Sequence, residues 1–480
     1  MTRAQAIIWT LLAYKLVMIA VGVIANRLAK DDSDYFLGGR RLGPAVAALS
    51  ASASSSSVWT LLGVSGFAYG FGLAAIWLLP ACLGGFALNW YLLAPALRRV
   101  AHERRAITVT ELLAGPPGTK LRRAVIVIAS AIILLSLLTY VAAQFQGAGK
   151  AFAETFDMRF EPALLLGAGI VIFYTLMGGF WAASLTDTIQ GLVMVVAAIA
   201  LPIVALGRVG LADTWASLVP EGLGLWAAAS KGLAPAAAIG LVLGLLGVGL
   251  GYPGQPHVVN RFMALRDEQG VVVGRRIAMS WALVIYAGMI ALGWALRILL
   301  PGLADREDAF MLGAELLLPP VIAGVMIAGV LSAIMSTVDS QLLVAASTVS
   351  HDLLGNAGER SETNAAALRR SRLTVLAISI GAVLVALWVD ESIFSSVLFA
   401  WSAMGAAFGP VLLVTVLRRR PRSDWVLAAM IAGFTLSVAA HLWSVSKGGA
   451  LERVLPFVIA LALSLRGAAE DEASTTSAPR

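Results

Sequence analysis

The sequence has few charged residues, little histidine and almost no cysteine. Only 13% of its 480 residues are charged, against roughly 25% in a soluble globular protein, so an ordinary soluble fold is excluded. The single cysteine, Cys82, excludes an internal disulfide and a cysteine-rich metal site. The four histidines are scattered, and no H-E-x-x-H motif or pair of carboxylates within an apolar run accompanies them. A membrane-embedded enzyme is therefore disfavoured.

Apolar residues take the place of the missing charges. Hydrophobic residues make up 59% of the chain, and its mean hydropathy is +0.85. A membrane-spanning helix needs about 20 predominantly apolar residues, and Lys15 within the first such run indicates a retained span, not a cleaved signal peptide. We therefore expect an all-α polytopic membrane protein with about 13 transmembrane helices. The candidate spans lie near residues 5–26, 44–71, 74–97, 124–149, 162–182, 187–207, 232–256, 277–300, 318–348, 373–389, 392–417, 424–444 and 451–466.

The basic residues predict how the chain crosses the membrane. Lys and Arg collect in cytoplasmic loops, and alternate loops together with the C-terminal tail hold 25 of the 35 Lys and Arg residues. We therefore place the N-terminus outside, the C-terminus in the cytoplasm and the protein in the inner or plasma membrane. The formal charge of +7 then reports topology, and no nucleic-acid partner is implied. The basic loops are 27–41, 98–123, 261–276, 360–372 and 418–422.

Two of the spans contain residues that disrupt helices. Six serines lie between Ser50 and Ser57, and residues 247–257 include four glycines and two prolines. Proline removes a backbone donor and glycine tolerates left-handed angles, so the second segment is expected to unwind. The breaks lie about 200 residues apart and each opens a block of five spans, a pattern typical of inverted-repeat transporters. The alternative is that small residues merely let the helices pack closely.

Several strings of the sequence are distinctive: DYFLGGRRLGP, TLMGGFWAASLTDTIQG, GLGYPGQPHVVNRFMA, AIMSTVDSQLLVAASTVSHDL and AWSAMGAAFGP. With them the chain resembles the sodium:solute symporter family, most closely its sodium/proline symporter branch, over about residues 34–420. The resemblance implies a five-plus-five inverted-repeat core of the APC/LeuT-like kind. The expected division is an extra helix and loop at 1–33, repeats at about 44–207 and 232–417, two helices at 421–466 and a disordered cytoplasmic tail at 467–480.

The resemblance also implies a sodium site between the second and ninth spans. Its ligands would be the carbonyls of Ala53, Ser56 and Ala333 and the hydroxyls of Ser336 and Thr337. Oxygen donors suit a hard cation, and a broken helix frees carbonyls. The three ninth-span residues stand at i, i+3 and i+4 and so share one helical face. The alternative is that the hydroxyls only bond back to the preceding helical turn.

Three further residues bear on the ion. Ser55 stands where the proline branch has an aspartate linked to sodium dependence, which removes formal charge from the site and leaves proton coupling open. Asp187 matches a family aspartate on the inner ion-exit route, and its alternative role is to cap the start of the sixth span. Asp339 is an intramembrane acid about 100° from the ion-facing stripe of its helix, so we expect an electrostatic contributor and not a ligand.

For the solute, the resemblance points to Trp59, Gly63, Tyr140, Tyr252 and Pro256. Aromatic walls and freed amides and carbonyls suit a small zwitterion. The tryptophan that the family has one turn before the tyrosine is Val248 here, so the pocket is reshaped.

The predicted function is therefore symport of a small organic solute, proline or a related amino acid, with a cation, most simply sodium. The partners are the solute, the sodium ion and the bilayer, and no cofactor is expected. Proton coupling and another small carboxylate remain alternatives. A transporter-like sensor is disfavoured by the short tail after residue 466.

Overall fold

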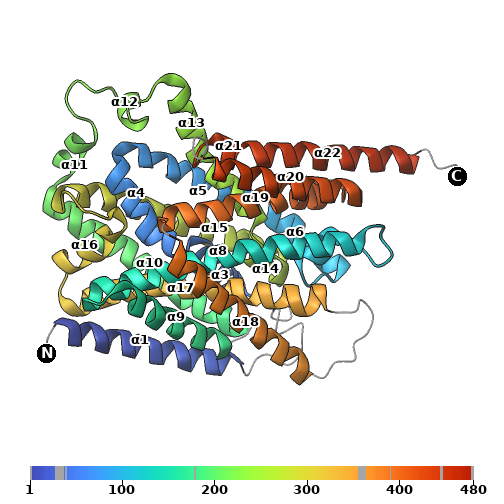
Figure 1. Ribbon diagram of the computed structural model, residues 1–480, viewed down its shortest axis with the longest axis horizontal. Helices are drawn as coiled ribbons and strands as arrows, with labels where there is room; N and C mark the ends of the chain where they lie inside the picture. The colour runs from blue at the N-terminus through green and yellow to red at the C-terminus, as the bar shows by residue number, and fades with distance from the viewer. Residues whose placement is uncertain are drawn as a thin grey trace.

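The computed structural model describes residues 3–26, 37, 40–177, 180–354, 364–389, 391–443 and 447–476. This part of the chain is helical, and its only β-type pairing is an isolated parallel bridge between Leu42 and Leu265. Most helices run along the long axis of the molecule, and the two ends of the chain lie near opposite ends of that axis (Figure 1). The all-α expectation is therefore confirmed.

The helices are numbered in chain order, with η for 3₁₀ and π segments. The first half contains α1 (Arg3–Asn26), α3 (Pro44–Val58), η2 (Trp59–Gly63), α4 (Val64–Phe71), η3 (Gly72–Trp77), α5 (Leu78–Ala87), η4 (Leu88–Leu93), α6 (Ala94–Arg104), α7 (Val109–Ala114), α8 (Arg122–Phe156), α9 (Phe160–Met177), α10 (Phe180–Val209), α11 (Leu211–Leu218) and α12 (Leu225–Ala229). The second half contains α13 (Pro235–Leu246), η5 (Gly247–Gly254), α14 (Pro256–Ala264), α15 (Glu268–Leu299), η6 (Arg306–Asp308), α16 (Ala309–Leu317), α17 (Pro320–Ser347), η7 (Thr348–Leu353), α18 (Asn364–Trp388), α19 (Ile393–Leu417), α20 (Ser423–Leu442), α21 (Ala450–Arg453) and α22 (Leu455–Thr476).

Ten helical segments of the described chain are long and apolar enough to cross a membrane. The predicted spans at 44–71 and 74–97 fall within a single run, Pro44–Arg104, and the apolar part of α9 is shorter than the others. The 61 residues of Pro44–Arg104 would make a helix of about 90 Å, roughly three times the thickness of the hydrocarbon core. The chain instead turns at Gly72, whose φ of +57° favours glycine.

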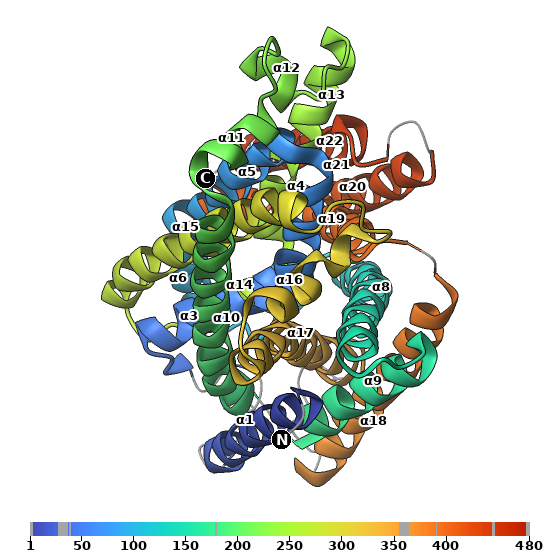
Figure 2. The ribbon, with the colours of Figure 1, turned by 90° about the vertical axis from the view of Figure 1, so that its left-hand side faces the viewer.

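The broken helix α3 lies inside the bundle. It packs against α10, α14, α15 and α17, and the view along the helices shows α3, α14 and α17 near the middle (Figure 2). In that view α1, α9 and α18 lie at one edge, and α20 and α22 lie toward another. Any site on α3 is therefore enclosed by helices on several sides.

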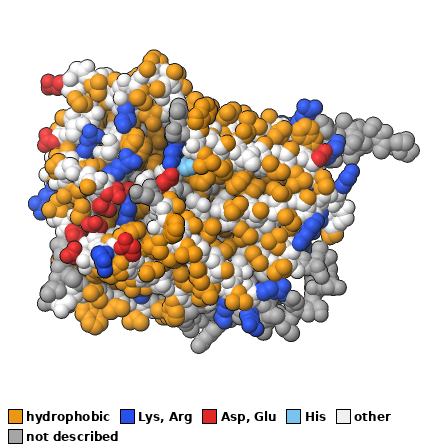
Figure 3. Space-filling model, in the orientation of Figure 1, with side chains coloured by type: hydrophobic (Ala, Val, Ile, Leu, Met, Phe, Trp, Pro, Cys, Tyr) orange, Lys and Arg blue, Asp and Glu red, His pale blue; other side chains and the backbone are white. Residues whose placement is uncertain are grey.

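The surface agrees with a chain embedded in lipid. Hydrophobic side chains cover the middle of the face shown in Figure 3, whereas Lys and Arg gather at the end near α6 and the C-terminus. Acidic side chains, with some basic ones, gather at the opposite end. Such a belt is what a bilayer of about 30 Å requires.

Two of the predicted segments, the tail at 467–480 and the loop at 27–41, lie partly outside the described residues. The helix α22 continues to Thr476, so most of the segment at 467–480, for which composition predicts disorder, is helical. Most of the predicted loop at 27–41 lies outside the described residues, as do residues 477–480.

Candidate functional site

The first feature of the site is the break in α3. Helix geometry is lost at Ser57, whose φ of 38° and ψ of −174° lie outside the helical region. For a residue other than glycine such angles cost on the order of 1–3 kcal/mol and persist only where the surroundings hold them. The chain then continues through the π-helical turn η2 into α4. The helix therefore breaks at Ser57, the last serine of the run.

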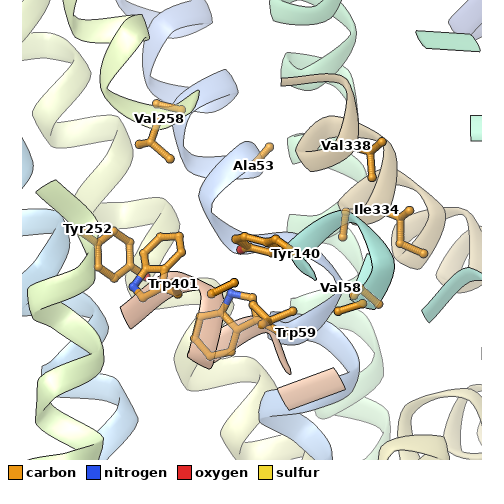
Figure 4. Close-up of a cluster of buried hydrophobic side chains, with 14 of the residues drawn as sticks. Ala53, Val58, Trp59, Tyr140, Tyr252, Val258, Ile334, Val338 and Trp401 are labelled. Carbon is orange, nitrogen blue, oxygen red and sulfur yellow. The ribbon is translucent and has the colours of Figure 1, made fainter. Parts of the chain in front are cut away.

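Side chains of α8 hold this break. Gln144 Oε1 accepts a hydrogen bond from the Val58 amide at 3.1 Å, and Gln144 Nε2 donates to Ser57 Oγ at 3.3 Å. Tyr140, one turn earlier, donates to the same Ser57 Oγ at 3.5 Å, and the Trp59 amide donates to it at 3.3 Å. Figure 4 shows Tyr140 beside the bend of α3. The amides that the break frees are therefore paired with side chains.

The seventh predicted span is unwound, as its glycines and prolines predict. The 3₁₀ segment η5 replaces α-helix over Gly247–Gly254, Gln255 is extended, and α14 starts at Pro256. The unwound backbone lies directly on α19, because a Cβ atom on Gly254 would approach the Cα of Gly405 to 2.6 Å. Glycine is required at this contact, since no side chain fits between the two backbones.

Aromatic rings pack against one another between the two breaks. The buried ring of Trp59 lies 5.9 Å from Tyr286 and 6.1 Å from Phe394, measured between centroids. The ring of Tyr252 lies 4.7 Å from Trp401 at nearly a right angle, and its hydroxyl is 2.7 Å from that of Tyr286. Figure 4 shows the neighbouring rings of Tyr252 and Trp401. An aromatic enclosure of this kind can surround the apolar side of a small solute.

The other predicted solute residues lie on the same elements. Gly63 ends η2 and lies against Phe394, whose Cβ would be 3.3 Å from a Cβ at Gly63. Pro256 is the first residue of α14. Val248 presents its carbonyl to the indole of Trp401 at 3.0 Å, so the ring beside Tyr252 comes from α19.

The predicted sodium ligands lie where α3 meets α17. Thr337 Oγ1 donates to the carbonyl of Ser54 at 3.0 Å, and Ser54 Oγ donates to the carbonyl of Ser336 at 3.2 Å. These are bonds between helices, and they bring the face of α17 that carries Ala333, Ser336 and Thr337 against the segment that carries Ala53 and Ser56. Most other hydroxyls of α17 bond back along their own helix, as Ser332 does to Ala328.

Three of the predicted ligands also have local partners. Ser336 Oγ donates to the carbonyl of Ala333 at 3.3 Å, and Thr60 Oγ1 donates to the carbonyl of Ser56. Back-bonding, the alternative considered for the hydroxyls, therefore describes Ser336 but not Thr337. Ser56 Oγ is buried and has no hydrogen-bond partner among the described residues.

Asp187 lies at the centre of a buried polar network. Its Oδ2 accepts hydrogen bonds from Ser50 at 2.7 Å and Ser54 at 3.2 Å, and it forms an ion pair with Arg261 at 3.1 Å. The interpretation of Asp187 as a helix cap is wrong, because α10 already begins at Phe180. Its Oδ1 has no hydrogen-bond partner in the described part of the chain.

Asp339 and Ser55 face other surroundings. Asp339 accepts a hydrogen bond from Thr175 of α9, so its carboxylate meets α9 and not α3. Ser55 lines a small cavity together with Asn89 of η4 and Phe262 of α14. Its hydroxyl donates to the carbonyl of Ser52 at 2.9 Å, while Asn89 Oδ1 is buried without a hydrogen-bond partner among the described residues.

Sequence reasoning missed two residues of this region. The predicted cytoplasmic loop at 261–276 includes Arg261, but the Arg261 side chain is only 2% exposed and contacts Asp187. A signal was present, because Arg261 stands in an otherwise uncharged segment at 256–265. The second residue is Gln144, whose amide is buried within an apolar span and therefore requires partners.

A charged cluster lies near one end of the site. Glu307 accepts hydrogen bonds from the amides of Ile393 and Phe394 at the start of α19, and from Lys150 of α8 at 2.8 Å. Lys150 also pairs with Asp305 at 2.5 Å. Burial raises the pKa of Asp305, but the contacts with Lys150, the Glu307 amide and Arg306 together hold this pKa below its ordinary value. The cluster thereby ties η6 to α8 and to the first turn of α19, next to Phe394.

Comparison with known proteins places these features in context. The model of the sodium:solute symporter family matches residues 35–433. The osmoregulated proline transporter OpuE of Bacillus subtilis is 34% identical over 469 residues, which cover 95% of this chain and 93% of that protein. The sodium/proline symporter of Escherichia coli is 35% identical over 433 residues, which cover 88% of this chain and 85% of that protein.

A solved structure is similar over nearly the whole chain. It is a Na⁺-coupled sialic acid symporter in a substrate-bound, outward-open state, with a TM-score of 0.78, and the match covers 97% of this chain and 98% of that one. The two sequences are 19% identical, so this likeness concerns the fold alone.

Proposed function

The chain belongs to the sodium:solute symporter family, and from that premise we propose that it is a sodium-coupled symporter that imports proline or a related amino acid. It is a multi-pass membrane transporter and not an enzyme. The proposal for the solute is supported by the names of relatives about 35% identical over most of the chain, which are proline transporters. The aromatic enclosure of Trp59 and Tyr252 between two broken helices is the structural observation that carries it.

For the ion we propose a site between α3 and α17, made by the carbonyls of Ala53, Ser56 and Ala333 and the hydroxyls of Ser336 and Thr337. The bond from Thr337 to the Ser54 carbonyl supports it, because this hydroxyl crosses between the helices instead of bonding back. The donors are neutral oxygens, the chemistry that a hard monovalent cation accepts. Sodium bound here would supply no chemistry beyond its charge and its oxygen preference.

We propose that Asp187 lies on the inner ion path and that Asp339 acts on the ion only through its field. The unpartnered Oδ1 of the buried Asp187 supports the first assignment. The bond from Thr175 supports the second, because it turns Asp339 toward α9.

The proposed mechanism is alternating access in a five-plus-five repeat with 13 spans. The two breaks, at Ser57 and at η5, support it, because each interrupts a helix at corresponding places in the two halves. We further propose that the N-terminus is outside and the C-terminus cytoplasmic, which the charge at the α6 end of Figure 3 supports.

The ion gradient sets what such a transporter can do. One charge moving through 100 mV yields about 2.3 kcal/mol, and a tenfold gradient adds about 1.4 kcal/mol. At one-to-one coupling the sum sustains roughly a 500-fold accumulation of solute.

Uptake by proteoliposomes tests the proposal. Labelled proline and a panel of amino acids and small carboxylates would be offered with an imposed sodium, lithium or proton gradient. We expect proline uptake that requires sodium. Uptake driven only by protons would assign proton coupling instead, and counterflow without any response to an imposed gradient would rule out symport.

A further inference from the structure

One face of α8 is shaped to the break in α3. Tyr140, Gln144 and Gly147 stand at i, i+4 and i+7 and therefore share a helical face. All three meet the break: Tyr140 and Gln144 bond to Ser57 Oγ, and a Cβ at Gly147 would approach Val58 Cγ2 to 2.6 Å. Because Gly147 has no side chain, α8 approaches α3 closely enough for the Gln144 side chain to reach the freed backbone.

Both polar atoms of the Gln144 carboxamide form hydrogen bonds at the break. The side chain is fully buried, its Oε1 accepts the Val58 amide at 3.1 Å, and its Nε2 donates to Ser57 Oγ at 3.3 Å. An acceptor is needed because the break leaves the Val58 amide without a carbonyl one turn back. The Nε2 donor anchors the Ser57 side chain, and this helps to hold the unfavourable backbone conformation of Ser57. A carboxamide supplies both on one side chain.

We propose that Gln144 is a positioning residue of the solute site, which fixes the broken end of α3 and thereby holds Trp59 in the aromatic enclosure. Trp59 follows Val58 directly, so its ring position depends on where the Val58 backbone is held. The identity of the solute rests on the proposed function, whereas the hydrogen bonds by which Gln144 fixes the break in α3 do not depend on it. While Gln144 is in place, the Val58 amide is not free to bind a carboxylate of the solute.

The same helix offers a matched control. Gln146 is also a buried glutamine of α8, but its Nε2 donates to the carbonyls of Ala386 and Val389 at 3.2 and 2.7 Å, at the end of α18. Loss of Gln146 therefore removes hydrogen bonds of the same kind without touching the break.

The first test compares Gln144→Leu and Gln146→Leu in proline uptake. We expect Gln144→Leu to raise the KM for proline at least tenfold with Vmax within about threefold, and Gln146→Leu to leave KM within about twofold. Gln144→Glu keeps an acceptor for Val58 but loses the amide donor to Ser57, so a smaller rise in KM is expected. If Gln144→Leu does not reach the membrane, Gln144→Glu decides. An unchanged KM in both Gln144 variants overturns the proposal.

The second test needs no solute. Hydrogen exchange of the purified protein in detergent would be followed for a peptide that contains Val58 and Trp59. We expect faster exchange in Gln144→Leu, a smaller increase in Gln144→Glu, which keeps an acceptor for the Val58 amide, and wild-type exchange in Gln146→Leu. Wild-type exchange in both Gln144 variants contradicts the positioning role, whereas a wild-type protein that does not take up proline contradicts the proposed function alone.

Discussion

The guanidinium of Arg261 lies 3.1 Å from the carboxylate of Asp187, with both side chains buried. The same guanidinium reaches Ser50 Oγ of α3 at 3.1 Å and Ser340 Oγ of α17 at 2.5 Å. Four helices, α3, α10, α14 and α17, therefore meet at one ion pair. In an apolar medium each charge depends on the other, because neither has bulk water to solvate it.

Removal of Arg261 alone should be severely destabilising. Arg261→Met leaves the Asp187 carboxylate buried without its counter-charge, which costs about 3–5 kcal/mol. Thermal unfolding of the purified protein measures this loss, and the double variant Asp187→Asn with Arg261→Met should recover at least half of it. Arg266→Met is the control, because the pair of Arg266 with Asp267 is exposed and contributes little. A stable Arg261→Met protein would contradict the assigned role of the pair.

Thr337→Val should weaken the dependence of uptake on sodium. The change removes the hydroxyl that crosses to the Ser54 carbonyl while it keeps the shape of the side chain. We expect the sodium concentration for half-maximal uptake to rise about tenfold, the equivalent of one lost ligand of ~1.4 kcal/mol. Ser336→Ala should act in the same direction.

Thr415→Val is the matched control for the ion site. Thr415 is a buried threonine of α19 whose hydroxyl only bonds back to the carbonyl of Val411 at 2.7 Å. The sodium concentration for half-maximal uptake by Thr415→Val should equal that of the wild type. The proposed ion site is wrong if Thr337→Val and Ser336→Ala both keep wild-type sodium dependence.

Ser55→Asp should make the protein depend more strongly on sodium for its stability. The side chain lines a cavity with Asn89 and Phe262, so the new carboxylate is buried and needs a cation nearby. We expect a lower Tm than wild type in potassium and a larger rise in Tm on addition of sodium. Ser55→Asn, similar in size but uncharged, should show the wild-type response to sodium. If sodium raises the Tm of both variants equally, position 55 does not lie close enough to the ion to affect its binding.

Stability should fall as the pH rises from about 5.5 to 8. Burial, together with the charges of Asp305, Glu154 and Glu307 and against that of Lys150, raises the pKa of Asp308 from 3.8 to about 7. The folded protein then holds this proton more tightly than the unfolded chain, so stability is lost as pH rises between the two pKa values. Asp305, whose pKa is lowered, acts below this window.

Asp308→Asn tests this pH dependence. The amide cannot ionise, so the difference in Tm between pH 5.5 and pH 8 should shrink relative to the wild type. Asp424→Asn, which changes an exposed carboxylate paired with Arg422, should keep the wild-type difference. A slope that is the same in Asp308→Asn and in the wild type would exclude Asp308 as its origin.

The sequence predicts features that depend on local composition better than features that depend on contact. Lipid requires apolar runs, so the helices coincide with the hydropathy maxima, and the glycines and the proline of η5 predict its unwinding. The partner of Asp187 lies 74 residues away and that of Ser57 lies 87 residues away on α8. The sequence marks Arg261 as a lone charge in segment 256–265, but nothing local to Arg261 or Gln144 identifies the partner, so both pairings require the three-dimensional structure.

The contact between Gly254 of η5 and Gly405 of α19 has a consequence for motion. No side chain stands between the two backbones there, so a small shift of one segment along the other requires no change of rotamer at the point of contact. A larger residue at either position would force the two backbones apart, because its Cβ would lie within 2.6 Å of a Cα atom of the other segment. We therefore expect substitution of Gly254 or Gly405 to slow the conformational exchange of the transporter more than it lowers the affinity for the solute.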